Sequence, residues 1–88
     1  MAAAGLLLSC ATKPPVQEMS EARSAIESAQ QLESHSSKAD QTIKSAEQSL
    51  QEASEAIDLK RYELARRKAI EAKRKAQRAA RMKRAAAN

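Results

Sequence analysis

The stretch YELARRKAIEAKRKAQRA, residues 62–79, decides the fold, because its apolar side chains recur at alternating steps of three and four residues. Tyr62 and the alanines at positions 65, 69, 72, 76 and 79 form this stripe. Such spacing places them on one face of an α-helix, as in the heptad seam of closely packed helices, and alanine on a seam permits close approach of the backbones. The stretch therefore predicts a helix over about residues 60–84 that packs against other helices.

Two more helices are expected upstream. Ser37, followed three residues later by Asp40, has the form of a capping box and predicts a helix over about residues 38–57. Its apolar stripe has the same steps: Ile43, Ala46, Leu50, Ala53 and Ile57. A helix over about residues 18–34 carries a shorter stripe, with Leu32 beside it: Met19, Ala22, Ile26 and Ala29.

The connection at residues 58–62, DLKRY, leaves two arrangements open. The step from Ile57 to Tyr62 is five residues, so the two stripes are out of phase. Either the chain turns back there, which is favoured, or one long helix continues with a displaced stripe, since no Gly or Pro follows position 15 to enforce a turn. The expected fold is all-α, a helical hairpin or a three-helix coiled-coil-like arrangement over residues 18–84, with residues 85–88 as a tail.

The segment GLLLSC, residues 5–10, resembles the lipobox of bacterial lipoproteins, which is cut immediately before a Cys that becomes lipidated. Residues 1–9 are then a short signal segment, although no Lys or Arg precedes the apolar run and basic residues are expected upstream of Met1. Residues 10–17, CATKPPVQ, are expected to form a tether stiffened by two prolines. The alternative for Cys10 is an unmodified thiol; a disulfide within the chain is excluded because it is the only cysteine.

If Cys10 is the first mature residue, the core of the remaining chain is thin. Leu, Ile, Val and Phe number nine among residues 10–88, about 11%, below the level of about 20% under which disorder becomes frequent. Alanine is the best helix former, but burial of its single methyl group contributes little. We therefore expect strong local helices and marginal stability as a monomer.

Charge is strongly polarised along the chain. Residues 60–88 carry twelve Lys and Arg against two acidic residues, a net charge of +10, whereas residues 10–59 carry a net charge of −5. The last helix is predicted to have a broad basic face that suits an anionic polymer or lipid headgroups. Its residues are Arg66, Arg67, Lys68, Lys73, Arg74, Lys75, Arg78 and Arg81, extended by Lys83 and Arg84. The alternative is a solvated face that pairs with acidic residues of the neighbouring helix, such as Glu47, Glu52 and Glu55.

No pattern in the sequence points to catalysis. A nucleophile–base pair, a carboxylate pair and a phosphate-binding Gly loop are all missing from it. His35 has no second His or Cys at ligand spacing, so it is expected to be a solvated loop residue. We expect no enzymatic activity, no metal and no cofactor.

The order of these features resembles a group of short bacterial envelope lipoproteins with an Ala-rich helical domain of unknown function. The resemblance is carried by Cys10, by KPP at 13–15, by EMSEARSAIESAQ at 18–30 and by DLKRYELARRKAIEAKRKAQRA at 58–79. The chain departs from that pattern at Ala39-Asp40, where Ala-Pro is common, and at Lys60-Arg61, where Gly-Asp is common before the Tyr. The resemblance implies a helical fold and an envelope location, without an established reaction.

The expected function is that of a small lipid-anchored envelope protein with a structural or interaction role. Ala11 rather than Asp after Cys10 is compatible with the outer membrane, facing the periplasm. The basic helix would then bind anionic lipid, lipopolysaccharide or cell wall. Two alternatives stay open: a cytoplasmic helical protein that binds nucleic acid, although Tyr62 is the only aromatic residue, or a helical module that pairs with a partner or with itself.

Overall fold

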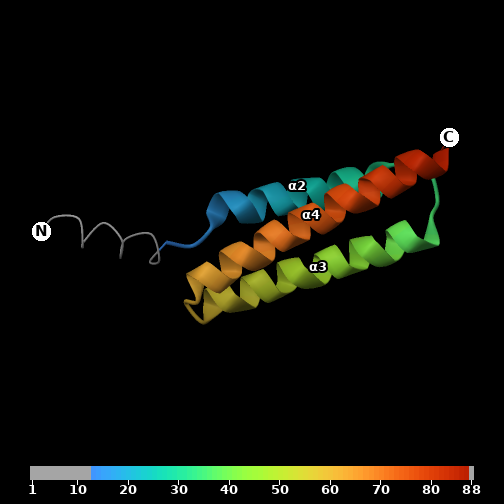
Figure 1. The fold of residues 1–88 in the computed structure, drawn as a ribbon. Coiled ribbons are helices and arrows are strands. Elements are labelled where there is room, and N and C mark those ends of the chain that lie inside the picture. The colour runs from blue at the N-terminus through green and yellow to red at the C-terminus, as the bar shows by residue number, and fades with distance from the viewer. Residues whose placement is uncertain (1–12, 88) are drawn as a thin grey trace, which may run out of the picture.

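The computed structural model describes residues 13–87, which form an all-α fold of three helices. These are α2 (Val16–Gln31), α3 (Ser37–Asp58) and α4 (Tyr62–Ala87). α2 and α4 run in the same direction and α3 runs antiparallel to both (Figure 1). The expected all-α fold is confirmed, in its three-helix form. Within residues 13–87, no helix combines the length and apolar composition needed to cross a membrane.

Helix α4 is the central element of the bundle. It packs along both other helices, whereas α2 and α3 contact each other much less. The chain order therefore does not match the order in space, because the last helix lies between the first two (Figure 1). Helix α4 therefore has two helix interfaces, one with α2 and one with α3.

The first helix is set by the prolines that precede it. Pro15 is the N-cap, and its carbonyl oxygen accepts a hydrogen bond from the Met19 N–H at 3.0 Å. The helix therefore begins at Val16, two residues before the expected start at 18. It ends at Gln31 rather than 34, because Leu32 has an extended backbone with ψ of 131°.

The N-terminus of α3 is capped by Ser36, not by the predicted Ser37. The Ser36 Oγ accepts a hydrogen bond from the Ala39 N–H at 3.2 Å, and Ser36 has the extended backbone typical of a cap. Ser37 is the first residue with helical geometry. The prediction was wrong by one residue because adjacent serines offer the same side chain, and only the backbone conformation distinguishes them.

Residues 59–61 reverse the chain between α3 and α4. Lys60 adopts a left-handed conformation with φ of 60°, the Arg61 N–H donates to the Ala56 carbonyl at 2.8 Å, and the Lys60 N–H donates to the Ile57 carbonyl at 2.9 Å. This pair of hydrogen bonds is the Schellman motif, which usually has Gly where Lys60 stands. The favoured turn is therefore present without glycine. α4 then continues to Ala87, through most of the segment expected to be a tail.

The core consists mainly of alanine. All of Ala39, Ala46 and Ala53 on α3 and Ala65, Ala72 and Ala79 on α4 have no exposed surface, and each set recurs every seven residues. Met19 and Ile26 of α2 and Ile43 of α3 are the larger buried side chains. Leu50 and Ile57 are only half-buried, since the weak contact between α2 and α3 leaves one side of them uncovered.

Candidate functional site

The lysines of the predicted basic face lie at the two edges of α4, where they reach neighbouring helices. Lys73 Nζ lies 2.9 Å from Glu21 Oε1 of α2. On the other edge, Lys68 Nζ lies 3.1 Å from Glu52 Oε1 of α3. These ion pairs join helices, and they are partly exposed, so each stabilises the bundle only modestly.

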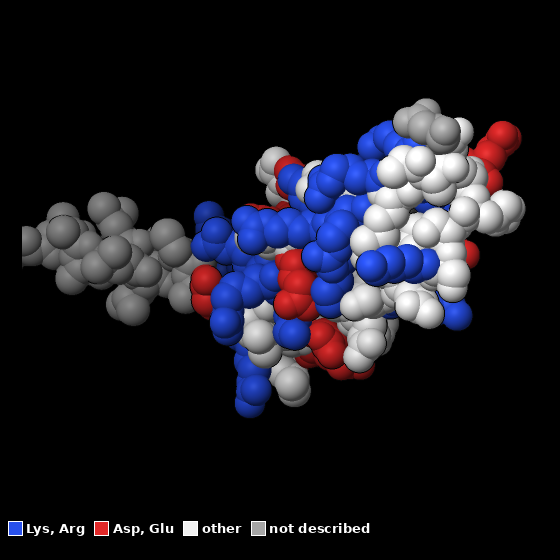
Figure 2. Space-filling view, turned by 45° about the vertical axis from the view of Figure 1, so that its right-hand side comes forward, with Lys and Arg blue, Asp and Glu red and all other residues white. Residues whose placement is uncertain are grey.

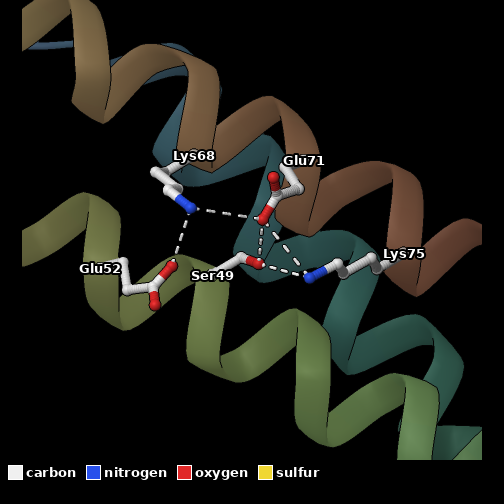
Figure 3. Close-up of polar contacts among 5 residues, drawn as sticks. All are labelled: Ser49, Glu52, Lys68, Glu71 and Lys75. Atoms are coloured by element: carbon white, nitrogen blue, oxygen red, sulfur yellow. Dashed lines mark hydrogen bonds and ion pairs between the residues drawn. The ribbon is translucent and has the colours of Figure 1, made fainter.

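A polar cluster of four residues joins α3 to α4 along the same edge (Figure 3). The Ser49 hydroxyl donates to Glu71 Oε2 at 2.6 Å and accepts from Lys75 Nζ at 2.9 Å. Lys75 Nζ also lies 3.4 Å from Glu71 Oε2, and Lys68 Nζ lies 3.8 Å from the same oxygen. Glu71 therefore receives one hydroxyl and two ammonium groups.

This environment favours the ionised form of Glu71. The pKa of its carboxyl lies below the ordinary value of 4.5, chiefly because Ser49 donates a hydrogen bond to it; desolvation opposes the shift, and Lys75 adds to it. The pKa of Glu21 is lowered too, first by the hydrogen bond from Lys73 and then by the one from Gln17. The pKa of Lys68 is raised, first through its hydrogen bond to Glu52.

The polar cluster is built for packing rather than for attack on a substrate. Ser49 is 1% exposed, and both its hydrogen and a lone pair are engaged by Glu71 and Lys75. A nucleophile must reach its substrate and must have a free base beside it. A charged lysine that donates to the hydroxyl is not such a base. Within residues 13–87, no three His, Cys, Asp or Glu side chains gather as metal ligands would.

The arginines of the predicted face differ from the lysines in their exposure and in their ion pairs. Arg67, Arg74, Arg78 and Arg81 are exposed, and we call these four residues the arginine row. None of them forms an ion pair with a carboxylate of residues 13–87. Arg67, Arg74 and Arg81 recur every seven residues, opposite the buried alanines of the same helix. The row is about 20 Å long, from the rise of 1.5 Å per helical residue.

The structure thus divides the eight predicted residues of the basic face into two groups. The arginine row lies together on the solvent side of α4, while Lys68, Lys73 and Lys75 are used in contacts with Glu52, Glu21, Glu71 and Ser49. Arg66 lies between these groups, with Nη2 3.7 Å from Glu63 Oε1. Of the acidic partners expected on α3, Glu52 pairs with α4, whereas Glu47 accepts from Gln30 and Glu55 from Gln51.

Lys83, expected to extend the basic face, is not a surface residue. It is 5% exposed, and its Nζ donates to the carbonyl oxygens of Ala29 at 2.9 Å and Leu32 at 3.2 Å. These carbonyls belong to the end of α2, which has no basic residue in its own last turn. A signal for this role is present in the sequence, because the three-and-four stripe of α4, continued four residues beyond Ala79, reaches Lys83.

The described part of the molecule is uneven in charge. On the face shown in Figure 2, Lys and Arg gather at the end from which the N-terminal trace leaves, with a few Asp and Glu among them. The opposite end of that face carries mostly other residues. The predicted lipidation site, Cys10, and the signal segment lie outside the described residues.

Over residues 13–87, these features define a three-helix bundle with an alanine core and one cationic helix face. The chain belongs to the family described as Domain of unknown function (DUF4398), which it matches over residues 17–88. The matched region includes all of α3 and α4 and all but the first residue of α2. The resemblance to an Ala-rich helical domain of unknown function is confirmed to that extent. No curated protein and no solved structure matches the chain significantly.

Proposed function

We propose that this protein is a small, non-catalytic component of the bacterial envelope, anchored through a lipid on Cys10 at the outer membrane and facing the periplasm. Its arginine row binds an anionic envelope surface: phosphate-bearing lipid, lipopolysaccharide or cell-wall polymer. The observation that carries the proposal is the separation of the cations of α4. Its lysines serve the helix interfaces, while the four arginines of the row, like Arg84, have no carboxylate partner within residues 13–87.

The chemistry of arginine supports a binding role for the row. A guanidinium group offers a planar set of donors that matches phosphate and carboxylate oxygens in pairs, and it stays charged at every physiological pH. Four such groups on one helix face add their attractions to an extended anionic surface without a pocket. The fold itself does not require these charges, because Arg67, Arg74 and Arg81 point away from both neighbouring helices.

The anchor is supported by the sequence around Cys10. LLLSC has the pattern of a lipobox, and the segment up to the start of α2 at Val16 contains Pro14 and Pro15 but no helix-forming run. One lipid chain holds a protein only weakly at a membrane, so stable attachment needs the multiple chains that a bacterial lipoprotein bears.

Metabolic labelling tests the anchor. Cells that express the full chain are supplied with a fatty-acid analogue, and the wild type is compared with Cys10→Ala. We expect label on the wild type alone, together with loss of Cys10→Ala from the membrane fraction. Recovery of Cys10→Ala in the membrane fraction at the wild-type level would exclude the lipid anchor.

Charge reversal tests the arginine row. A triple variant with Arg67→Glu, Arg74→Glu and Arg81→Glu is compared with Arg23→Glu, Lys38→Glu and Lys44→Glu, which changes the net charge equally at exposed positions of α2 and α3. Both are sedimented with anionic vesicles and with purified cell wall at two salt concentrations. We expect the first variant to bind much more weakly than the second. Wild-type binding should fall steeply with salt, because exposed charges are screened beyond about 8 Å at physiological ionic strength.

Two measurements test the alternatives. Binding of duplex DNA or RNA, combined with a cytoplasmic location of the unlabelled chain, would favour the nucleic-acid interpretation, because the same row suits a phosphodiester backbone. Self-assembly through the alanine seam has less support, since Ala46, Ala53, Ala72 and Ala79 are already buried inside one chain. A concentration-independent sedimentation coefficient would exclude it.

A further inference from the structure

Two large apolar side chains stand exposed among the described residues, and both lie at the same end of the bundle. Val16 at the start of α2 is 72% exposed, and Leu59 in the α3–α4 turn is 66% exposed. Figure 1 shows that the start of α2 and the α3–α4 turn lie at the same end of the bundle. We call this the proximal end, made of residues 13–16 and 58–62.

The backbone holds Leu59 outward. Leu59 is the C-cap of α3, and the Schellman hydrogen bonds of Lys60 and Arg61 fix the reversal around it. Ile57, two residues earlier, packs beside Met19 and the core. An isolated exposed leucine needs no explanation by itself. Leu59 needs an explanation because it lies at the same end as Val16 and the tether.

Cations lie close in the sequence to both apolar side chains. Lys60 and Arg61 directly follow Leu59, and Lys13 precedes Val16 by three residues. Residues 58–67 carry four Lys and Arg against Asp58 and Glu63, and Glu63 Oε1 lies 3.7 Å from Arg66 Nη2. Exposed apolar side chains with Lys and Arg beside them are a composition that suits the headgroup boundary of an anionic membrane.

The tether fixes which end of the bundle meets the membrane. Five residues lie between Cys10 and Val16, and the six residue steps span about 20 Å in a fully extended chain. The far end of α4 lies about 38 Å farther along the helix axis, at 1.5 Å for each of the 26 residues of α4. A lipid on Cys10 therefore keeps the proximal end within about 20 Å of the bilayer, whereas the far end reaches the bilayer only if the bundle lies on its side.

We infer that the proximal end seats on an anionic lipid surface, with Val16 and Leu59 entering the headgroup boundary and Lys13, Lys60 and Arg61 contacting the headgroups. This inference rests on the proposed lipid anchor at Cys10. The bundle then stands upright on its membrane. The arginine row runs along the bundle axis, so it is presented sideways to the periplasmic space instead of lying flat on the lipid.

Tryptophan placed at each end of the bundle tests this posture. The chain contains no Trp and a single Cys, so the full chain can be joined through Cys10 to a maleimide lipid in phosphatidylglycerol-containing vesicles. Leu59→Trp and Val16→Trp report on the proximal end, and Ala85→Trp, also exposed, reports on the far end. Lipids with brominated acyl chains quench a Trp that reaches the boundary.

We expect strong quenching and a blue shift of emission for Trp at positions 59 and 16, and neither for Trp at position 85. Adding Lys60→Glu and Arg61→Glu to Leu59→Trp should abolish the quenching, whereas adding Lys38→Glu and Lys44→Glu should leave it. Equal quenching at positions 59 and 85 would mean a side-on posture and would overturn the inference, as would absence of quenching at positions 59 and 16.

This experiment is separate from the test of the anchor. Its tether is made chemically, so its outcome does not depend on whether cells lipidate Cys10. Failure of the metabolic labelling would remove the anchor from the proposed function, while quenching would still show what the proximal end binds. Failure of the quenching would leave the anchor and the arginine row intact and remove only the upright posture.

Discussion

Lys83 Nζ, near the end of α4, donates a hydrogen bond to the carbonyl oxygen of Ala29 at 2.9 Å, and this contact joins the last turns of the two parallel helices α2 and α4. A second bond to the Leu32 carbonyl satisfies another acceptor at the same helix end. The positive charge of Lys83 also stabilises the C-terminal end of α2, where the helix dipole is negative. Lys83, at a seam position of α4, thus places a positive charge at the C-terminal end of α2, which has no basic residue in its own last turn.

Lys83→Met should therefore destabilise the bundle by about 1.5–3 kcal/mol, because a nearly isosteric apolar chain removes two hydrogen bonds from a charged donor. The Ala29 carbonyl then keeps only its bond from the Leu32 N–H. Arg84→Met is the matched control, since Arg84 is exposed and adjacent. Urea titration followed by circular dichroism gives the free energy of unfolding of each. Equal stability of the two variants would mean that the contact with Ala29 contributes nothing.

Lys60→Gly should stabilise the protein by about 1 kcal/mol, because Lys60 has φ of 60° and a side chain with a Cβ is strained in this conformation. For a domain of this size, the melting temperature should rise by about 4–8 °C. Lys60→Ala is the control, since it removes the charge and keeps the Cβ. If alanine stabilised as much as glycine, the charge rather than the backbone would be responsible.

Ala72→Leu should destabilise the protein by about 1–3 kcal/mol, although leucine is the more hydrophobic residue. Ala72 has no exposed surface, so three further carbons would force α4 away from its neighbours. Ala86→Leu, at an exposed position of the same helix, should change stability little. Thermal unfolding distinguishes the two, and an Ala72→Leu protein that melted above the wild type would show that the seam is loosely packed.

Stability should fall as the pH is lowered from 7 to 3. The folded-state pKa values of Glu21 and Glu71 lie below their ordinary value of 4.5, so the unfolded chain binds protons first. Their contribution is complete above that value and is lost as the pH falls through the folded-state pKa. The double variant Glu21→Gln and Glu71→Gln should have a melting temperature that depends less on pH in this range. Glu27→Gln, at an exposed position, should keep the wild-type dependence.

The arginine row shows how much of the candidate site can be predicted from the sequence. Heptad spacing places Arg67, Arg74 and Arg81 on one face without any structure. The same spacing could not show that Lys68 and Lys73 are used by other helices, because that depends on which residue of a neighbour stands opposite. Glu21 and Lys73 are 52 residues apart in the chain, and no local pattern relates them.

Local chemistry and periodicity determine that three stretches within residues 16–87 form helices and which faces those helices bury. The four residues of the expected stripe of α2, from Met19 to Ala29, are all buried. The shared face of alanines at three-and-four spacing follows from the geometry of a single helix, so it can be predicted from the sequence. The reversal at Lys60 is harder to predict from the sequence, since it relies on an unfavourable backbone conformation that the packing of α3 on α4 holds in place.

Tertiary structure alone decided the order of the helices in space, with α4 between α2 and α3. That order determines which cations of α4 face carboxylates, which one is buried at the end of α2, and which arginines face solvent. It also leaves Leu50 half-covered and gathers Val16 and Leu59 at one end. The physical reason is that helix identity depends on neighbours within one or two turns, whereas partner choice depends on residues brought together from distant parts of the chain.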